Sequence, residues 1–397
     1  QEVRMKSTLI KKGGIATAIL GFGLMLSACG GGGGGGGGTP GGSTASVVPS
    51  TYQGAYTGAL QPGDFVSFYV SGNTLSYTVT GTVSTNLCAN YSSYIDQSYA
   101  TCVNSNSITG TLTLTPISGL SGNNYFEATA GGNPVYVFLS GSAGIFAVPT
   151  QSVTLAFVGY KNILSNGTSI SQYLNNFTSI PSHTFIYAKY DYTSGSIDIY
   201  SLTVSSNYSY TYYDYNTNTP GGGCWTPDYN NNRIIAENMP NSNCSGVPIS
   251  SPNYNIILTP AGGITVDYTD GSGIGVGVPA LSSLPPGSYT ISAADIGGNA
   301  GLATESLTVY IPSTGSTGSY TTLYTVAGSQ PQLYTGSLTV GKDCNGIQVS
   351  GIISATNSAG ECYDIFLDPA DYYYVTVRTW VRNGSNPYLI SIGAIQQ

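Results

Sequence analysis

The sequence predicts an all-β protein, in which several antiparallel sandwich-like or barrel-like units follow a flexible Gly-rich tether. Two observations support this prediction. Short runs of alternating apolar and polar residues recur from residue 51 onward, separated by Gly, Asn, Ser and Pro, as is typical of strands with one buried face. The runs are rich in Val, Ile, Thr and Tyr, whose branched or aromatic side chains fit a half-buried pleated surface.

The predicted strands fall into three β units, because one close pair of cysteines occurs in each. The first unit, residues 51–160, contains the runs Phe65–Val70, Thr74–Val79, Thr111–Leu114, Val135–Leu139 and Val153–Val158. The second unit, residues 161–311, contains Thr184–Tyr192, Ser196–Val204, Ile256–Thr259, Ile264–Tyr268, Tyr289–Ala293 and Ser306–Ile311. The third unit, residues 312–397, starts with the linker-like PSTGSTGS and contains Leu338–Val340, Ile347–Ile353 and Tyr372–Val381.

The N-terminal segment has the pattern of a secretory signal peptide over residues 5–28. Basic residues precede an apolar stretch at residues 15–26 that is too short to span a bilayer as a mature helix. The stretch ends in Leu26-Ser27-Ala28-Cys29, which resembles the lipobox of bacterial lipoproteins. The resemblance implies that the signal is removed and that the sulfur of Cys29 takes a diacylglyceryl group, which would attach the protein to a membrane.

Residues 29–50 follow as the lipidated cysteine and its tether. Nine glycines at 30–38 and a Gly/Ser/Thr-rich continuation cannot bury apolar surface and behave as a flexible coil. The coil has an r.m.s. reach of roughly 25 Å. In lipoproteins of diderm bacteria an Asp after the acylated Cys favours retention in the inner membrane. Gly30 stands there, so the resemblance implies the outer membrane, on its periplasmic face or at the cell surface.

The composition is poor in charge. Only 7% of the residues are charged and the net charge is −8, so the basic footprint of a nucleic-acid-binding protein is absent. Solubility must depend on neutral hydroxyl and amide groups, which remain uncharged between neutral and acid pH. One hypothesis is that this composition suits an acidic or variable exterior. The alternative is that many exported β proteins are simply poor in Lys and Glu.

Six cysteines follow Cys29 in three close couples, and an export signal places them where thiols are oxidised. We therefore expect the disulfides Cys88–Cys102, Cys224–Cys244 and Cys344–Cys362. A zinc site is disfavoured because no couple has C-x2-C spacing and the sequence has a single histidine, His183. We expect no metal and no cofactor.

One segment of the second unit has a family resemblance. Residues 284–311, LPPGSYTISAADIGGNAGLATESLTVYI, resemble the last hairpin of bacterial immunoglobulin-like domains. The resemblance implies that Tyr289 bonds to backbone upstream of its strand and so caps a corner. Ile291 stands where antibody domains carry a cysteine, so the inter-sheet disulfide of those domains is absent.

Catalytic patterns are mostly missing. A Ser-His-Asp or Cys-His apparatus would depend on His183, and neither a G-x-S-x-G elbow nor a phosphate-binding loop occurs. Two groups of acidic residues are candidates for the carboxylate pair of a glycosidase. The alternative is that these residues have only a structural role in turns and hairpins. The groups are Asp191 with Asp198, and Asp364 with Asp368 and Asp371. We predict that the protein is not an enzyme, with a glycoside-active enzyme as a minor alternative.

Aromatic residues supply the candidate binding site. Tyr208, Tyr210 and Tyr212 alternate, which places their rings on one face of a strand, and Trp225 follows nearby. Such a strip serves sugar binding or adhesion, or packs against another layer of the same protein. Tyr372, Tyr373, Tyr374 and Trp380 raise the same alternatives.

Two functions remain. The favoured one is a structural or adhesive lipoprotein of the outer envelope, whose partners are the membrane, glycan, matrix or other envelope proteins. The alternative is a lipoprotein that binds glycan or another small ligand on a Tyr/Trp platform. A pocket with convergent aromatic side chains would favour the alternative, and a flat body with exposed strand edges would favour the structural role.

Overall fold

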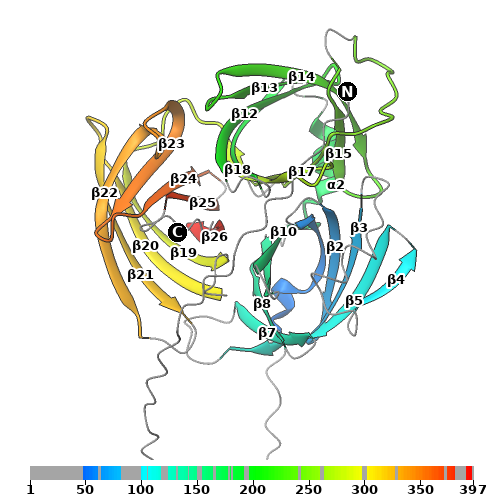
Figure 1. Ribbon diagram of the computed structural model, residues 1–397, viewed down its shortest axis with the longest axis horizontal. Helices are drawn as coiled ribbons and strands as arrows, with labels where there is room; N and C mark the ends of the chain where they lie inside the picture. The colour runs from blue at the N-terminus through cyan, green and yellow to red at the C-terminus, as the bar shows by residue number, and fades with distance from the viewer. Residues whose placement is uncertain are drawn as a thin grey trace, which may run out of the picture. The chain divides into compact units, whose positions relative to one another are not determined.

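The computed structural model of the chain consists of an open sheet and two closed barrels, formed by successive segments of antiparallel strands (Figure 1). The structure describes residues 48–60, 64–81, 100–104, 106–117, 124–130, 133–141, 143–149, 154–163, 167–177, 179, 182–191, 196–239, 243–259, 263–296, 302–326, 330–370, 373–380 and 390–395. The predicted signal peptide, Cys29 and the tether before Val48 lie outside the described residues, as do Cys88, Asp371 and Tyr372. The all-β prediction is confirmed.

The open sheet follows a short 3-10 turn, Ser50–Tyr52, and has the strand order β4-β5-β3-β2-β1-β10-β9-β8-β7-β6. Its strands are β1 Gly54–Leu60, β2 Asp64–Ser71, β3 Thr74–Thr80, β4 Ala100–Asn104, β5 Ser107–Thr113, β6 Thr115–Pro116, β7 Tyr125–Ala130, β8 Asn133–Leu139, β9 Ala143–Pro149 and β10 Thr154–Lys161. Burial alternates along β2 and β3, as the sequence pattern predicts. One face therefore packs a core in which the rings of Tyr56 and Phe68 stack with centroids 4.6 Å apart.

The first barrel contains β11 to β18, and pairing of β11 with β18 closes it. Its strands are β11 Ser182–Asp191, β12 Ile197–Ser205, β13 Ser209–Asp214, β14 Thr219–Asp228, β15 Arg233–Glu237, β16 Tyr254–Leu258, β17 Ile264–Tyr268 and β18 Gly273–Pro279. Closure removes the free edges of this sheet.

A short helix, α2 (Ile170–Phe177), precedes this barrel. Ser169 caps it: the Ser169 hydroxyl accepts the Gln172 amide and the Gln172 side chain accepts the Ser169 amide, which is a capping box. Ile170, Leu174 and Phe177 bury its apolar face in the barrel's core cluster. No helix within the described residues is long and apolar enough to cross a membrane.

The second barrel contains β19 to β26 and is closed by pairing of β19 with β26. Its strands are β19 Gly287–Ile296, β20 Leu302–Ile311, β21 Thr317–Val326, β22 Gln332–Lys342, β23 Gln348–Asn357, β24 Cys362–Asp368, β25 Tyr373–Trp380 and β26 Ile390–Ile395. Alternate residues such as Ile291, Leu307 and Ile365 face inward and form its core.

The predicted boundary at residue 311 and the immunoglobulin-like interpretation are both wrong. Strands β19 and β20, expected to end the second unit, pair with β26 and β21 in the last barrel. The segment read as a linker is a hairpin turn, in which Gly315 adopts φ +81°, a conformation that glycine tolerates best. The local expectation for Tyr289 does hold, because its hydroxyl donates to the Pro285 carbonyl at 2.7 Å.

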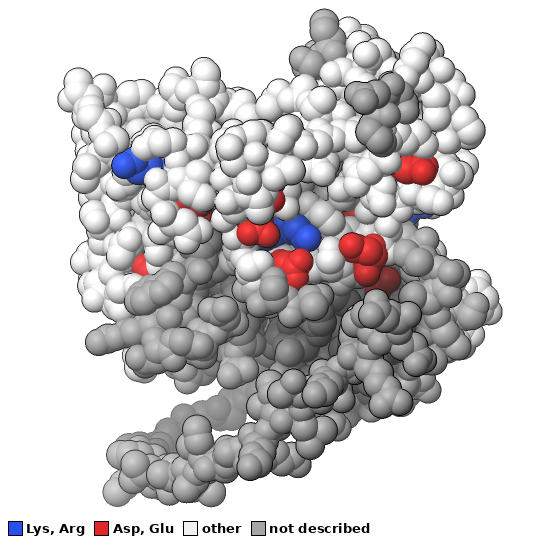
Figure 2. Space-filling model, turned by 45° about the horizontal axis from the view of Figure 1, so that its top comes forward, with Lys and Arg blue, Asp and Glu red and all other residues white. Residues whose placement is uncertain are grey.

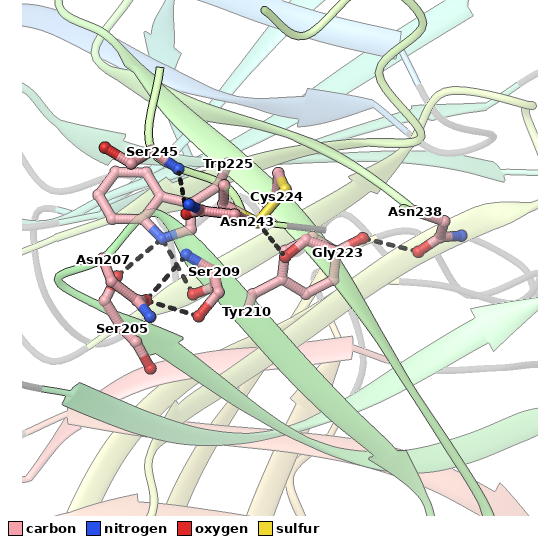
Figure 3. Close-up of a disulfide and its surroundings, with 11 residues drawn as sticks. Ser205, Asn207, Ser209, Tyr210, Gly223, Cys224, Trp225, Asn238, Asn243 and Ser245 are labelled. Carbon is pink, nitrogen blue, oxygen red and sulfur yellow. Dashed lines mark hydrogen bonds between the residues drawn. A yellow bond between two sulfur atoms is a disulfide. The ribbon is translucent and has the colours of Figure 1, made fainter. Parts of the chain in front are cut away.

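Two of the three predicted disulfides are present. Cys224 on β14 is bonded to Cys244 (Figure 3), and Cys344, in the turn after β22, is bonded to Cys362 at the start of β24. Cys102 is also disulfide-bonded, while Cys88, the partner expected for it, lies outside the described residues. Each of the two described bridges closes a local loop.

Candidate functional site

The tyrosine strip predicted from the sequence does not form an exposed platform. Tyr210 and Tyr212 lie on β13 with their side chains on the inner face of the closed barrel, and Tyr208 lies in the preceding turn with φ +66°. Tyr210 and Trp225 are each only 2% exposed. The alternation correctly placed Tyr210 and Tyr212 on one face, but closure of the sheet buries that face.

Trp225 anchors the turn between β12 and β13. Its indole N–H donates to the carbonyls of Ser205 and Ser209 at 3.0 and 3.1 Å (Figure 3). Its ring lies 5.2 Å from the ring of Tyr208 and 6.0 Å from that of Phe177 on α2. A buried Trp with a satisfied N–H is a core residue, so these contacts assign it to packing.

Six tyrosines converge inside this barrel around a cavity of about 60 Å³. Sequence analysis named two of them and missed the other four, which lie on strands whose pairing with β13 was not predicted. The lining residues are Tyr187, Tyr200, Leu202, Tyr210, Tyr212, Tyr254, Ile256, Val266 and Tyr268. The cavity has room for roughly four to six waters, which is too little for a sugar.

The described side chains that line the cavity are uncharged, although Asp214 forms a hydrogen bond with the lining Tyr200. The hydroxyls of Tyr187 and Tyr268 share a hydrogen bond of 3.0 Å, and burial raises the pKa of both phenols well above the ordinary value. The Lys189 ammonium lies 4.3 Å from the centroid of the Tyr268 ring and 3.3 Å from an Asp191 carboxylate oxygen. The barrel interior therefore combines packed phenols with a neighbouring ion pair, and the lining side chains satisfy one another rather than leaving a site for a ligand.

Three of the acids considered for glycosidase chemistry, Asp191, Asp364 and Asp368, make structural contacts. Asp191 pairs with Lys189. Asp364 and Asp368 are 0% and 3% exposed, and each accepts a backbone N–H, from Cys344 at 2.8 Å and from Ala370 at 3.2 Å. None of them lines the tyrosine cavity.

His183 is likewise a packing residue. Its ring stacks on that of Phe177 with centroids 3.8 Å apart. Burial lowers the pKa of the imidazole, opposed by a backbone hydrogen bond at Phe177. A neutral, stacked imidazole contributes to the contact between α2 and β11.

A surface that sequence analysis missed lies on the outward side of β20, β21, β22 and β23, yellow to orange in Figure 1. We call it the hydroxyl face. Strand pairing sets its exposed or half-exposed side chains in rows across the strands. The rows are Thr317-Thr339-Ser354, Tyr310-Ser319-Ser337-Thr356, Thr308-Thr321-Thr335 and Ser306-Leu323-Leu333.

The hydroxyl face carries almost no charge. Of the residues of its four strands only Glu305 and Lys342 are charged; Glu305 is 5% exposed and Lys342 ends β22. The low charge content of the sequence is also visible in Figure 2. On the face in view, the charged side chains of the described residues form a few small patches among uncharged atoms. A pattern of Ser and Thr at alternate strand positions was visible in the sequence, but it reads there as ordinary solvent exposure.

A groove of about 630 Å³ lies on the open sheet, over β1, β2, β3 and β5. We call it the β2–β3 groove. The residues that line it are Ala55, Tyr56, Ser67, Phe68, Tyr69, Ser76, Tyr77, Thr78, Thr109, Gly110, Thr111 and Asn162. None of these described lining residues is charged, and Tyr69 is 55% exposed.

Comparisons with known proteins give distant matches. No family model and no curated protein matches the sequence. Two crystal structures of transferrin binding protein B are similar to 84% of this chain. The one from Haemophilus parasuis Hp5, a vaccine antigen with one Trp replaced by Ala, has 8% identity and a TM-score of 0.23 over 65% of its length. The isotype 1 protein from serogroup B Neisseria meningitidis has 9% identity and a TM-score of 0.24 over 66% of its length. The chain thus spans about two thirds of those structures, and similarities at this level assign it no function.

Proposed function

We propose that the protein is a lipid-anchored, non-enzymatic adhesive protein of the outer envelope, and that its hydroxyl face contacts neutral hydroxylated polymers of a matrix or a neighbouring cell. The observation that carries the proposal is the hydroxyl face itself. Its rows of Ser and Thr are exposed and ordered by strand pairing.

The chemistry of the face suits a neutral polymer. Each Ser or Thr hydroxyl both donates and accepts a hydrogen bond, and strand pairing repeats these groups about every 4.8 Å across the sheet. Many weak contacts at a regular spacing add to a strong attachment. Tyr310, Leu323 and Leu333, which are 47%, 42% and 66% exposed, add apolar contact at two edges of the face.

The architecture favours contact through side chains. Both barrels are closed, so their strands have no free edges to pair with another chain. The lipobox at Cys29 and the glycine tether support the anchored location, because they would hold the β units away from the lipid surface while leaving them free to turn.

The experiment compares two variants that add the same charge at exposed threonines. Thr321→Lys places an ammonium in the middle of the hydroxyl face, and Thr211→Lys places one on the outer side of β13. We expect Thr321→Lys to weaken binding to a neutral polysaccharide film by about tenfold or more, while Thr211→Lys binds like the parent. Equal binding by Thr321→Lys and the parent, with normal folding of both, would remove the face from the proposal.

A further inference from the structure

The β2–β3 groove has a floor built from two rows of small hydroxyl residues. Ser67, Thr78 and Thr109 form one row across β2, β3 and β5. Ser76 and Thr111 form the second row with Tyr69. The intervening residues Phe68 and Tyr77 also line the groove, but they are buried, as expected where side chains alternate to the opposite face of the sheet. Strand alternation therefore directs the hydroxyl side chains into the groove.

These floor hydroxyls have no partner among the described residues. Within the described part of the chain, Ser67, Ser76, Thr78, Thr109 and Thr111 make no side-chain hydrogen bond to another residue. Each retains a donor and an acceptor for a molecule in the groove. The floor therefore offers hydrogen-bonding groups that the fold itself does not use.

Asn162 and Tyr69 complete the groove. The Asn162 side-chain oxygen accepts the Thr57 hydroxyl at 2.8 Å, which leaves the amide nitrogen of Asn162 as a donor. Tyr69 is paired across the strands with Ala55 and Ser76. Because both neighbours are short, the 55% exposed ring of Tyr69 stands above the floor.

The size and charge of the groove define the ligand class. About 630 Å³ falls within the roughly 300–1,000 Å³ of small-molecule sites. An anionic or cationic ligand would find no counter-charge among the described lining residues, none of which is charged. An aromatic ring beside several neutral donors and acceptors suits a molecule that has both an apolar ring face and many hydroxyls.

We infer that the β2–β3 groove binds a short neutral oligosaccharide. The apolar C–H face of one sugar ring packs on Tyr69. The sugar hydroxyls exchange hydrogen bonds with the floor residues and with the amide of Asn162. This site lies on a different sheet from the hydroxyl face and takes a soluble ligand, so it goes beyond the proposed adhesive function.

The test measures binding of the purified protein to an array of neutral and charged oligosaccharides, followed by titration of the best neutral trisaccharide. We expect saturable binding of neutral members and none of uronic-acid members. Tyr69→Ala is expected to weaken binding by about tenfold or more, and Thr78→Val to weaken it less. Tyr69 is outward-facing, so its replacement leaves the buried core in place, and the thermal midpoint of each variant checks the fold.

Two controls separate binding in the groove from the general effect of losing an exposed side chain. Thr74→Val changes an exposed threonine of β3 that does not line the groove. Tyr229→Ala removes a tyrosine of similar exposure, 42%, from the turn between β14 and β15, which belongs to neither surface. Both should bind the trisaccharide like the parent. The inference would be overturned if no neutral oligosaccharide bound, or if folded Tyr69→Ala bound as well as the parent. Neither result would affect the comparison of Thr321→Lys with the parent on a polysaccharide film.

Discussion

Asp267 on β17 makes the stability of the protein depend on pH. Its side chain is 0% exposed, and one carboxylate oxygen accepts the Asn255 amide at 2.7 Å. The other oxygen has no hydrogen-bond partner among the described residues. Burial raises the pKa of Asp267 from 3.8 to about 7, with the Asn255 hydrogen bond opposing and the nearby Asp64 carboxylate adding to the rise. The folded protein therefore prefers the neutral acid.

The direction and size of the effect follow from this pKa. Because the folded state binds the proton of Asp267 more tightly than the unfolded chain does, the stability that Asp267 contributes is greatest below about pH 4. It falls as the pH rises toward 7. At 1.36 kcal/mol for each pH unit between the two pKa values, the loss is about 4 kcal/mol, which is an upper figure. Asp64, whose pKa burial raises to about 6, adds a smaller loss in the same direction.

Asp267→Asn is expected to remove most of this dependence, since the amide stays neutral and its oxygen still accepts from Asn255. The assay is urea unfolding at about pH 4.5, 6 and 8. Asp270→Asn is the control, because it removes an exposed carboxylate of the same hairpin that makes the smallest contribution to the raised pKa of Asp267, and it should change the slope of the parent only slightly. If the free energy of unfolding of Asp267→Asn and of the parent changed in parallel with pH, the reasoning would be refuted.

Three further changes test other parts of the structure. Trp225→Ala should lower the free energy of unfolding by on the order of 3–5 kcal/mol. The control Tyr229→Ala, at a 42% exposed tyrosine of the same hairpin, should change it by less than about 0.5 kcal/mol. Similar losses for the two variants in urea unfolding would contradict the packing role of Trp225. Removing the Cys344–Cys362 bridge, which joins residues 18 apart, should cost about 3 kcal/mol by the loop-closure model, and an unchanged urea midpoint would count against it. Cys29→Ser should abolish palmitate labelling and leave unprocessed precursor, and a native N-terminus well downstream of Cys29 in mass spectrometry would exclude lipidation there.

Local features of the fold were predictable because they depend on neighbours in sequence. The runs Phe65–Val70 and Thr74–Val79, predicted as strands, lie within β2 and β3. The couples Cys224–Cys244 and Cys344–Cys362 are bonded as their spacing indicated. The capped helix α2 was not anticipated, since its eight residues form too few turns to show a clear helical period.

Non-local features were not predictable in the same way. Alternation showed that Tyr210 and Tyr212 share a face, but whether a sheet closes over that face depends on pairing between β11 and β18, which lie far apart in the chain. The hairpin around Gly315 was mistaken for a linker, because turns and linkers share the same small polar residues.

The two candidate surfaces illustrate the same limit. Thr78 and Thr109 are adjacent in the β2–β3 groove because β3 pairs with β5, although thirty-one positions separate them in the sequence. Likewise, Thr308 and Thr335 become members of one row only when β21 pairs on both sides. A single exposed Thr in the sequence does not indicate a function. The rows exist only because the register of strand pairing aligns Thr and Ser residues from different strands.

The salt dependence of attachment tests the central claim most directly. The purified protein is applied to a neutral polysaccharide film, and its affinity is measured from about 0.05 M to about 1 M NaCl, a range over which exposed charge interactions are strongly screened. Attachment through an uncharged hydroxyl face predicts an affinity that stays constant within about twofold. A fall of about tenfold or more, or no attachment at any salt concentration, would contradict the proposed adhesive function.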